Sequence, residues 1–386
     1  MPTTKLQNSD EFKDQKFFIG MDVHKRSWTI TIRSLGIQIE RFTQPPSVES
    51  LVTHLQRNYP GGKYYSAYEA GFCGTDMHEQ LCKLGVENMV VHAADIPTTD
   101  KQRKNKTDLH DSRAIAEKLE KNEIHGIHVL TREQQELRSL FRLRRQKSID
   151  VTRANNRLKG YLAYLAIELP AELSKCEYLS KKALDWLSNL ELLAEAGTLS
   201  LRNYSEELKY QRKQLSQITK LLRGQIKIHH TKSYDYLITI PGIGPVTAMA
   251  LLAEIADFNR FKYPDEYCSY LGLMPWEESS GDTVRTKGIQ PRCNTFLRPL
   301  LMEAAWVAIK NNRDLFAYYS KHAKKGSKHA IVKVARKVAL TARAVVQKQQ
   351  PFNPDYLKSK QTANEGLQGI TEMHINEKPD KRELPG

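Results

Sequence analysis

The stretch Phe17-Phe18-Ile19-Gly20-Met21-Asp22-Val23-His24 decides the fold of the first part of the chain. From Ile19 onward, apolar side chains alternate with small or polar ones, which is the period of a β-strand. A turn at 24–27 and two further alternating segments, at 28–33 and 37–42, follow directly. Together these segments predict three antiparallel strands connected in series.

Helical spacing then alternates with short strand patterns. Apolar residues at 48, 51, 52 and 55 predict a helix that Pro60-Gly61-Gly62 ends. The elements expected after it are a strand at 63–69, a helix at 75–84, a strand at 86–92 and a helix at 107–119. This order suits one mixed sheet with flanking helices. We therefore expect a polar arm at 1–16 and an α/β domain at 17–130.

The segment at 131–230 is long, helical and nearly free of Gly and Pro. Ten positions between Leu137 and Leu169 follow a 4-3-4-3 spacing, and seven of them are apolar, which indicates a coiled-coil seam with polar interruptions. Pro170 ends this helix, and a second one is expected over about 199–228. The pair predicts an antiparallel hairpin or a dimerisation stalk, with a plain helical bundle inside one subunit as the alternative.

The segment at 231–350 predicts a mainly α-helical C-terminal domain. Its expected elements are a turn at Pro241-Gly242-Ile243-Gly244, a helix at 246–255, a loop region at 271–291 and helices at 294–310 and 330–348. The tail at 351–386 is polar, and we expect it to be mostly disordered.

The 386 residues carry a net charge of +15, which favours a polyanionic partner, either nucleic acid or an anionic membrane surface. No apolar run approaches the ~18 residues that a membrane span needs. The five cysteines are widely spaced and form no CxxC pair, so neither a disulfide framework nor a zinc knuckle is supported. The polar N-terminus lacks the apolar core of a signal peptide. We expect a cytoplasmic protein with reduced thiols.

Four carboxylates fall where two strands and a helix can converge. Asp22 lies inside the first strand, Glu69 ends a later strand, and Asp108 and Asp111 share one face of the helix that follows. Taken singly, Asp22 suits a solvent-facing edge and the acidic pair suits the first turn of a helix. Together they predict a site for Mg²⁺ or Mn²⁺, because both ions prefer oxygen ligands and remove the repulsion among four anions. Such a site can support phosphodiester cleavage.

Three basic stretches predict contact with nucleic acid. A loop at 101–106 precedes Asp108, the segment 132–159 holds nine Lys or Arg against three acids, and 315–350 holds nine and no acid. Solvated loops or helix faces are the alternative. The turn with Gly242 and Gly244 resembles that of helix-hairpin-helix proteins, where backbone N–H groups approach a phosphate, and a tight turn into a packed helix is the alternative. The residues expected to contact nucleic acid are Lys104, Lys106, Arg142, Arg144, Arg145, Gly242, Gly244, Arg298, Lys324, Lys325 and Lys328.

Several motifs together resemble the DEDD transposases of bacterial insertion sequences. The N-terminal ones are Phe18-Ile19-Gly20-Met21-Asp22-Val23-His24-Lys25, Tyr68-Glu69-Ala70-Gly71 and Lys106-Thr107-Asp108-Leu109-His110-Asp111-Ser112-Arg113. The segment from Ile240-Pro241-Gly242 through Leu271-Gly272-Leu273-Met274-Pro275 to Ser280-Gly281 resembles their C-terminal transposase domain. The resemblance covers roughly 17–345, in order.

The resemblance implies a RuvC-like domain of the RNase H fold, whose acidic tetrad of Asp22, Glu69, Asp108 and Asp111 binds Mg²⁺. It implies that Ser280, with Ser279 as the adjacent rival, attacks DNA to form a phosphoserine link, although a serine before glycine is ordinarily turn chemistry. It further implies a bridge RNA that pairs with donor and target DNA, dimers or dimers of dimers, and a nucleoid-associated bacterial enzyme.

One loop departs from the family pattern. The family usually has Lys-x-Gly-Asn before Leu-Arg, whereas this chain has Pro291-Arg292-Cys293-Asn294 before Leu297-Arg298. The departure bears on the DNA contacts of this loop and leaves the carboxylate and serine assignments unchanged.

The leading hypothesis from the sequence is an RNA-guided DNA recombinase or transposase. The first alternative is a RuvC-like, metal-dependent junction or single-strand nuclease that uses water and forms no covalent intermediate. The second is a non-catalytic nucleic-acid-binding protein, because motif matches also arise without the activity.

Overall fold

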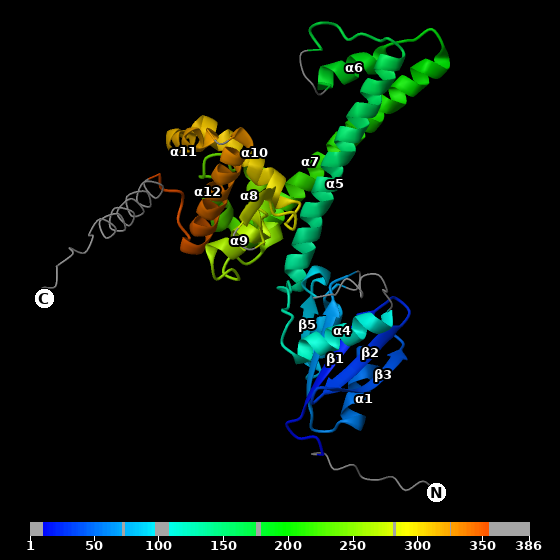
Figure 1. The fold of residues 1–386 in the computed structure, drawn as a ribbon. Coiled ribbons are helices and arrows are strands. Elements are labelled where there is room, and N and C mark those ends of the chain that lie inside the picture. The colour runs from blue at the N-terminus through cyan, green and yellow to red at the C-terminus, as the bar shows by residue number, and fades with distance from the viewer. Residues whose placement is uncertain are drawn as a thin grey trace, which may run out of the picture. The chain divides into compact units, whose positions relative to one another are not determined.

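The computed structural model describes residues 11–71, 74–96, 108–174, 179–280, 283–324 and 326–354. The side chains of residues 108–110, 277–280 and 283–287 lie outside this description, as do most of the predicted polar arm and tail. The chain divides into two compact units, Met1–Thr131 and Arg132–Gly386, which are described separately (Figure 1).

The first unit is a five-stranded sheet with helices on both faces (Figure 1). Its elements are β1 (Lys16–Val23), β2 (Trp28–Ser34), β3 (Ile37–Gln44), α1 (Val48–Asn58), β4 (Lys63–Glu69), α2 (Asp76–Lys83), β5 (Glu87–Val91), the 3₁₀ turn η1 (Ala93–Asp95) and α4 (Asp108–Glu120). The strand order is β3-β2-β1-β4-β5. β2 pairs antiparallel with β1 and β3, whereas β4 pairs parallel with β1 and β5. This is the RNase H arrangement, so the predicted fold class is confirmed.

The central strand β1 is buried on both faces because helices cover each side of the sheet. Phe17, Ile19 and Met21 are fully buried and pack with the apolar faces of α1 and α2. The opposite face meets Ile115 and Leu119 of α4 in a second, smaller cluster. Successive residues of β1 therefore face two different apolar clusters, one on each side of the sheet.

The second unit begins with a long helical hairpin and ends in a helical domain that holds one small β-hairpin (Figure 1). Its elements are α5 (Arg132–Tyr164), α6 (Lys181–Asn189), α7 (Glu195–Leu237), α8 (Pro245–Ile255), α9 (Pro264–Tyr270), β6 (Pro275–Ser280), β7 (Thr283–Ile289), α10 (Leu297–Asn311), α11 (Arg313–Ala323) and α12 (Ser327–Lys348). Among the helices that the structure describes, none is long and apolar enough to cross a membrane.

The predicted coiled-coil seam faces α7 of the same chain. Arg144 Nε donates to Thr219 Oγ1 at 3.1 Å, and Tyr161 Oη donates to the Gly197 carbonyl at 3.1 Å, so the two helices run antiparallel. Seam residues Val151, Leu158 and Leu162 are buried in this contact. The hairpin within one subunit is thus the pairing that the structure contains. Dimerisation stays a prediction.

Two parts of the C-terminal domain differ from the sequence expectations. The region expected to be a loop at 271–291 contains the antiparallel pair β6–β7. The helix α11 was not expected, and the helix expected to begin at 330 begins at Ser327 as α12. Residues 247–255 of α8 are all buried and form the centre of this domain together with apolar residues of α10 and α12.

Candidate functional site

Two carboxylates end neighbouring strands at the same edge of the sheet. β1 and β4 run parallel, with Met21 opposite Tyr68. Asp22 and Glu69 are the next residue on each strand, so the pairing brings them side by side at the carboxyl ends of both strands. Glu69 is exposed, whereas the Asp22 side chain is only 18% exposed and its Oδ2 is buried.

Helix α4 is clamped onto β1 and β2 in one orientation. Near its start, the hydroxyls of Ser112 and Thr31 lie 2.9 Å apart in a fully buried hydrogen bond. At its other end, Arg33 Nε donates to Glu120 Oε2 at 2.8 Å. Since Arg33 lies opposite Phe18 at the start of β1, the first turn of α4 lies at the end of β1 that carries Asp22.

The two predicted helix carboxylates belong to that first turn. Asp108 begins α4 and Asp111 follows one turn later, directly before the buried Ser112. Asp111 is half-buried, and the Asp108 side chain lies outside the described residues. The fold therefore gathers Asp22, Glu69 and the start of α4 at one edge of the sheet.

His24 also lies at this edge, although its spacing in the sequence indicated no role for it. Its Nε2 lies 3.3 Å from Asp22 Oδ2, and its side chain is half exposed. Among the described side chains, no group of three His, Cys, Asp or Glu is close enough to form a metal cage. The donors present are nevertheless carboxylate oxygens around an accessible edge, which is the chemistry that a hard divalent cation requires.

The predicted serine lies in the second unit. Ser280 ends β6 and pairs with Thr283 of β7 at the tip of the β-hairpin, with Ser279 opposite Val284. Both serine side chains lie outside the described residues. A hairpin tip presents its backbone away from the domain core, which is a favourable place for a side chain that must reach another molecule.

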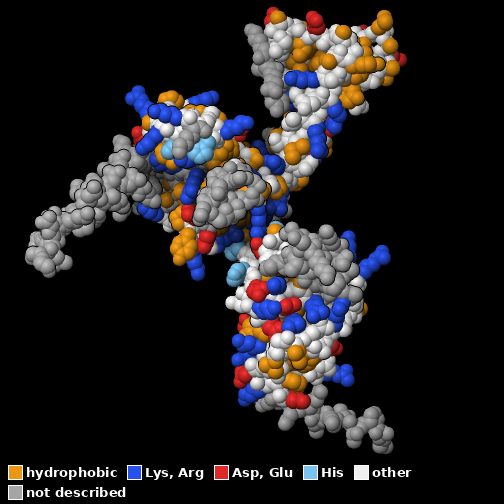
Figure 2. Space-filling model, viewed as in Figure 1, with side chains coloured by type: hydrophobic (Ala, Val, Ile, Leu, Met, Phe, Trp, Pro, Cys, Tyr) orange, Lys and Arg blue, Asp and Glu red, His pale blue; other side chains and the backbone are white. Residues whose placement is uncertain are grey.

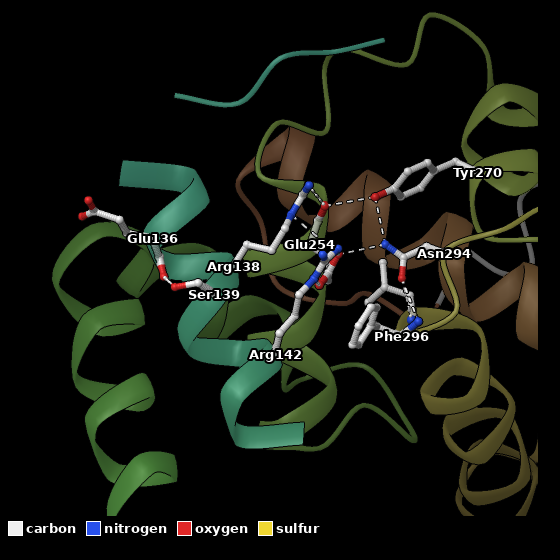
Figure 3. A network of polar contacts seen from close by, with 9 residues as sticks. Glu136, Arg138, Ser139, Arg142, Glu254, Tyr270, Asn294 and Phe296 are labelled. Carbon is white, nitrogen blue, oxygen red and sulfur yellow. Dashed lines mark hydrogen bonds and ion pairs between the residues drawn. The ribbon is translucent and has the colours of Figure 1, made fainter. Parts of the chain in front are cut away.

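A buried carboxylate in α8 gathers polar groups from α5, α9 and the segment before α10 (Figure 3). Glu254 is fully buried, and Arg142 of α5 donates to its two carboxylate oxygens at 2.8 and 3.0 Å. Asn294 Nδ2 donates to Glu254 Oε2 at 3.0 Å. The hydrogen bond to Glu254 raises the pKa of the Arg142 guanidinium. A buried anion is stable only with such partners, so this cluster locks α5 to α8.

The same cluster fixes the start of α10. Asn294 Oδ1 accepts from the backbone N–H groups of Phe296 and Leu297, both at 3.0 Å. Tyr270 Oη donates to the Glu254 carbonyl at 3.1 Å. Arg138 donates to that carbonyl at 2.6 Å, and burial lowers the pKa of its guanidinium. We call Glu254, Arg138, Arg142, Tyr270 and Asn294 the Glu254 cluster.

Two transposase family models match this chain, one in each compact unit or largely within it. The DEDD transposase model of the IS110 group matches residues 19–166, and the model described as the transposase IS116/IS110/IS902 family matches residues 234–320. The chain belongs to the IS110 family of transposases. A DEDD transposase domain implies a divalent metal, and a transposase implies DNA binding.

Individual relatives are similar to this chain over part of their length, and the chain spans about 60% of several of them. A probable family 20 transposase of Pseudomonas aeruginosa is 27% identical over 205 residues, which is 53% of this chain and 60% of the relative. The transposase of insertion sequence element IS1111A from Coxiella burnetii is 24% identical over 65% of this chain and 69% of its own. The pilin gene-inverting protein of Moraxella bovis is 29% identical over 141 residues, 36% of this chain and 43% of its own.

The predicted nucleic-acid contacts of this IS110-family chain occupy different environments. Arg142 and Arg144 hold helices together within the second unit, as described above. Arg145 lies over the Phe296 ring, 5.3 Å from its centroid. Lys324 and Lys328 are exposed, whereas Lys104, Lys106 and Lys325 lie outside the described residues.

The two glycines of the turn before α8 have different surroundings: Gly242 is closely packed and Gly244 faces open space. Gly242 has φ +88°, and a Cβ there would overlap the Ala304 carbonyl oxygen of α10, so it serves close packing. Gly244 precedes α8 as its N-cap, and a Cβ there would meet open space. Of the two, Gly244 has the room that a phosphate contact requires.

The loop that departs from the family pattern is tied to the protein by Arg298. Its guanidinium donates to the carbonyls of Gln290 and Pro291 at 3.1 and 3.2 Å, and also contacts Cys293 Sγ. A Cβ at Gly272 would overlap Cys293, so the cysteine fills the space beside this glycine. Arg298 therefore holds the departing loop in place.

Proposed function

We propose that this chain is the DNA-cutting and rejoining enzyme of an insertion sequence, with Asp22, Glu69, Asp108 and Asp111 as catalytic carboxylates and Ser280 as nucleophile. The observation that carries the proposal is the convergence of β1, β4 and the first turn of α4 at one edge of the RNase H-like sheet. The match of both transposase models, in order along the chain, supports it.

We infer that Mg²⁺, with Mn²⁺ as a substitute, is held by these four carboxylates. When bound, a divalent cation polarises the scissile phosphate and favours the deprotonated hydroxyl. The two carboxylates of α4 are held in a fixed position, because the helix is joined to β2 by the Ser112–Thr31 hydrogen bond and by the Arg33–Glu120 ion pair.

The proposed serine step conserves the energy of the phosphodiester. Ser280 Oγ loses its proton as its bond to phosphorus forms, the P–O3′ bond breaks, and the leaving 3′ oxygen takes up a proton. The 3′-hydroxyl of a partner strand then attacks the phosphoserine and releases Ser280. Because one phosphodiester replaces another, the exchange needs no ATP. The name of the Moraxella bovis relative, a pilin gene-inverting protein, supports rejoining rather than cleavage alone.

We further propose a bridge RNA that pairs with donor and target DNA, and a dimer or dimer of dimers. The net charge of +15 suits two polyanionic partners. Exposed apolar residues on α7 support oligomerisation: Leu199, Tyr210, Leu221 and Ile228 are 57%, 55%, 62% and 70% exposed. Their spacings of 11, 11 and 7 residues place them on one face of the helix.

A covalent protein–DNA adduct is the test of this function. The full chain would be purified with its co-purifying RNA, that RNA would be sequenced, and DNA with the matching site would be added with Mg²⁺. We expect an adduct on a denaturing gel that Ser280→Ala and Asp108→Asn abolish. RNase treatment should also abolish it. Ser279→Ala and Glu49→Gln, an exposed acid of α1, are matched controls that should retain it.

Other outcomes identify the alternatives. An adduct lost in Ser279→Ala but kept in Ser280→Ala moves the nucleophile by one residue. Cleavage that needs Asp22 but gives no adduct indicates the water-using nuclease. DNA binding with neither cleavage nor adduct, unchanged in Asp22→Ala, indicates a non-catalytic binding protein.

A further inference from the structure

A pocket at the corner between α10 and α11 has the lining of a nucleobase site. Its volume is about 520 Å³, and its lining residues are Ile309, Lys310, Asn311, Asn312, Arg313 and Phe316. Phe316 is 55% exposed, although phenylalanine ordinarily buries its ring. Within the described part of the chain, this ring stacks on no other aromatic side chain and carries no cation over its face.

The charge at this corner is positive. Lys310 and Arg313 are both exposed, and neither forms an ion pair with any residue that the structure describes. The nearest acid in sequence, Asp314, is exposed and is not part of the pocket lining. Lys and Arg side chains gather over α10 and α11 (Figure 2). The pocket thus combines an exposed aromatic ring with two cations that form no ion pair within the described part of the chain.

Further aromatic rings continue from the pocket along α11. Tyr319 lies one helical turn after Phe316, and its ring centroid is 5.9 Å from that of Trp306, which is 37% exposed. Proteins that bind single strands combine aromatic rings, on which successive bases stack, with cations that contact the phosphates between them. Paired bases inside a duplex cannot present a face to such rings.

We propose that this pocket binds an unpaired base of a DNA strand, with the base stacked on Phe316 and the flanking phosphates near Lys310 and Arg313. The inference rests on the proposed function, because strand exchange exposes unpaired bases in DNA. A second copy of the chain is a poorer occupant, since a symmetric contact would bring each Lys310 and Arg313 toward their own copies.

The test measures DNA binding by the full-length protein in EDTA, so that it is independent of catalysis. Fluorescence anisotropy would compare an oligothymidine with an abasic oligomer of the same length and charge. Phe316→Ala should weaken binding of the oligothymidine about 5- to 100-fold and leave the abasic oligomer unchanged. Phe316→Tyr should bind as the wild type does. Tyr164→Ala, at an 83% exposed ring near the end of α5, is the matched control and should change neither.

The contribution of Lys310 and Arg313 would be measured separately, by the salt dependence of single-strand binding. Replacing Lys310 and Arg313 by alanine should reduce the salt-dependence slope of single-strand binding by about 1.4, or about 0.7 for each lost phosphate contact. Photo-crosslinking of an oligomer that carries 5-iodo-deoxyuridine should map to Phe316 or its neighbours.

Three results with Phe316→Ala would overturn the inference. They are equal affinity of Phe316→Ala and wild type for oligothymidine, equal loss on the abasic oligomer, and a change in oligomeric state caused by Phe316→Ala. A base effect seen with oligouridine RNA but not with DNA would also reject the assignment to a DNA strand. If Phe316→Ala retains single-strand binding while the wild type forms the serine adduct, only this inference fails and the proposed function stands.

Discussion

Gly20 is the residue on which the geometry of the acidic edge most directly depends. A Cβ at this position would overlap the carbonyl oxygen of Ser112 and the backbone nitrogen of Ala116, so α4 touches β1 backbone to backbone. Asp22 lies two residues along the strand, and Asp111 directly precedes Ser112. The separation between the strand carboxylate and the helix carboxylates therefore depends on the absence of one methyl group.

Gly20→Ala should push α4 off the sheet and move Asp108 and Asp111 away from Asp22. Overpacking of this kind costs about 1–3 kcal/mol in the free energy of unfolding. Because catalytic carboxylates tolerate little displacement, we expect the rate of DNA cleavage to fall about 100-fold or more. Chemical denaturation and a single-turnover cleavage assay would measure the two effects.

Gly160→Ala is the matched control for this substitution. Gly160 lies in α5, one turn before the helix ends at Tyr164, and a Cβ there would meet open space. Replacing a helical glycine by alanine should raise stability by about 0.5–1 kcal/mol and leave cleavage unchanged. Unimpaired cleavage in Gly20→Ala would show that the close contact between α4 and β1 does not set the geometry of the site.

The sequence indicated the carboxylates but not the contacts that hold them. Asp22 stands out because it interrupts an apolar strand, and Asp108 and Asp111 stand out by their helical spacing. The Thr31–Ser112 hydrogen bond joins residues 81 positions apart, and two ordinary hydroxyl residues give no local signal of it. Phe316 had no signal either, because its exposure is a property of the folded surface.

At the scale of the elements, the Glu254 cluster joins α5, α8 and α10. Glu254→Gln keeps the shape of the side chain but removes the charge that Arg138 and Arg142 surround. Breaking a buried ion pair costs about 3–5 kcal/mol, and the half-exposed Arg142 favours the lower end of that range. We expect a loss of about 3 kcal/mol in the free energy of unfolding, measured by urea denaturation.

Asp265→Asn provides the comparison. Asp265 forms a 2.6 Å ion pair with Arg336 in the same domain, but its side chain is 66% exposed. Its loss should cost less than about 1 kcal/mol. Equal effects of the two substitutions would mean that the burial of Glu254 does not govern the strength of its cluster.

Several elements show which features of the structure the local sequence pattern predicts and which it does not. The heptads of α5 predicted that it packs against another helix but did not identify that helix. Apolar side chains with heptad spacing can pack against any helix that has a matching apolar seam. The pair β6–β7 was expected to be a loop because Glu277-Glu278-Ser279-Ser280 has no apolar alternation. Glu254, the one acid in an otherwise apolar helix at 246–255, was a signal that could have been used, since charged residues are seldom buried unless paired.

At the scale of the whole molecule, each compact unit has apolar cores of its own. The clusters of the first unit draw on residues between 12 and 129, and those of the second on residues between 137 and 352. No cluster formed by the described residues contains side chains of both units. Because cooperative unfolding follows shared cores, the protein should unfold in two transitions.

The two substitutions discussed above separate these transitions. Scanning calorimetry of the full chain should show that Gly20→Ala lowers the midpoint of one transition and Glu254→Gln lowers that of the other. Each change should leave the second transition within about 1 °C of the wild type, because distant independent sites do not couple. A single transition that both substitutions shift equally would mean that the units fold as one cooperative body. The sheet edge that carries Asp22 and Glu69 and the hairpin that carries Ser280 would then unfold together.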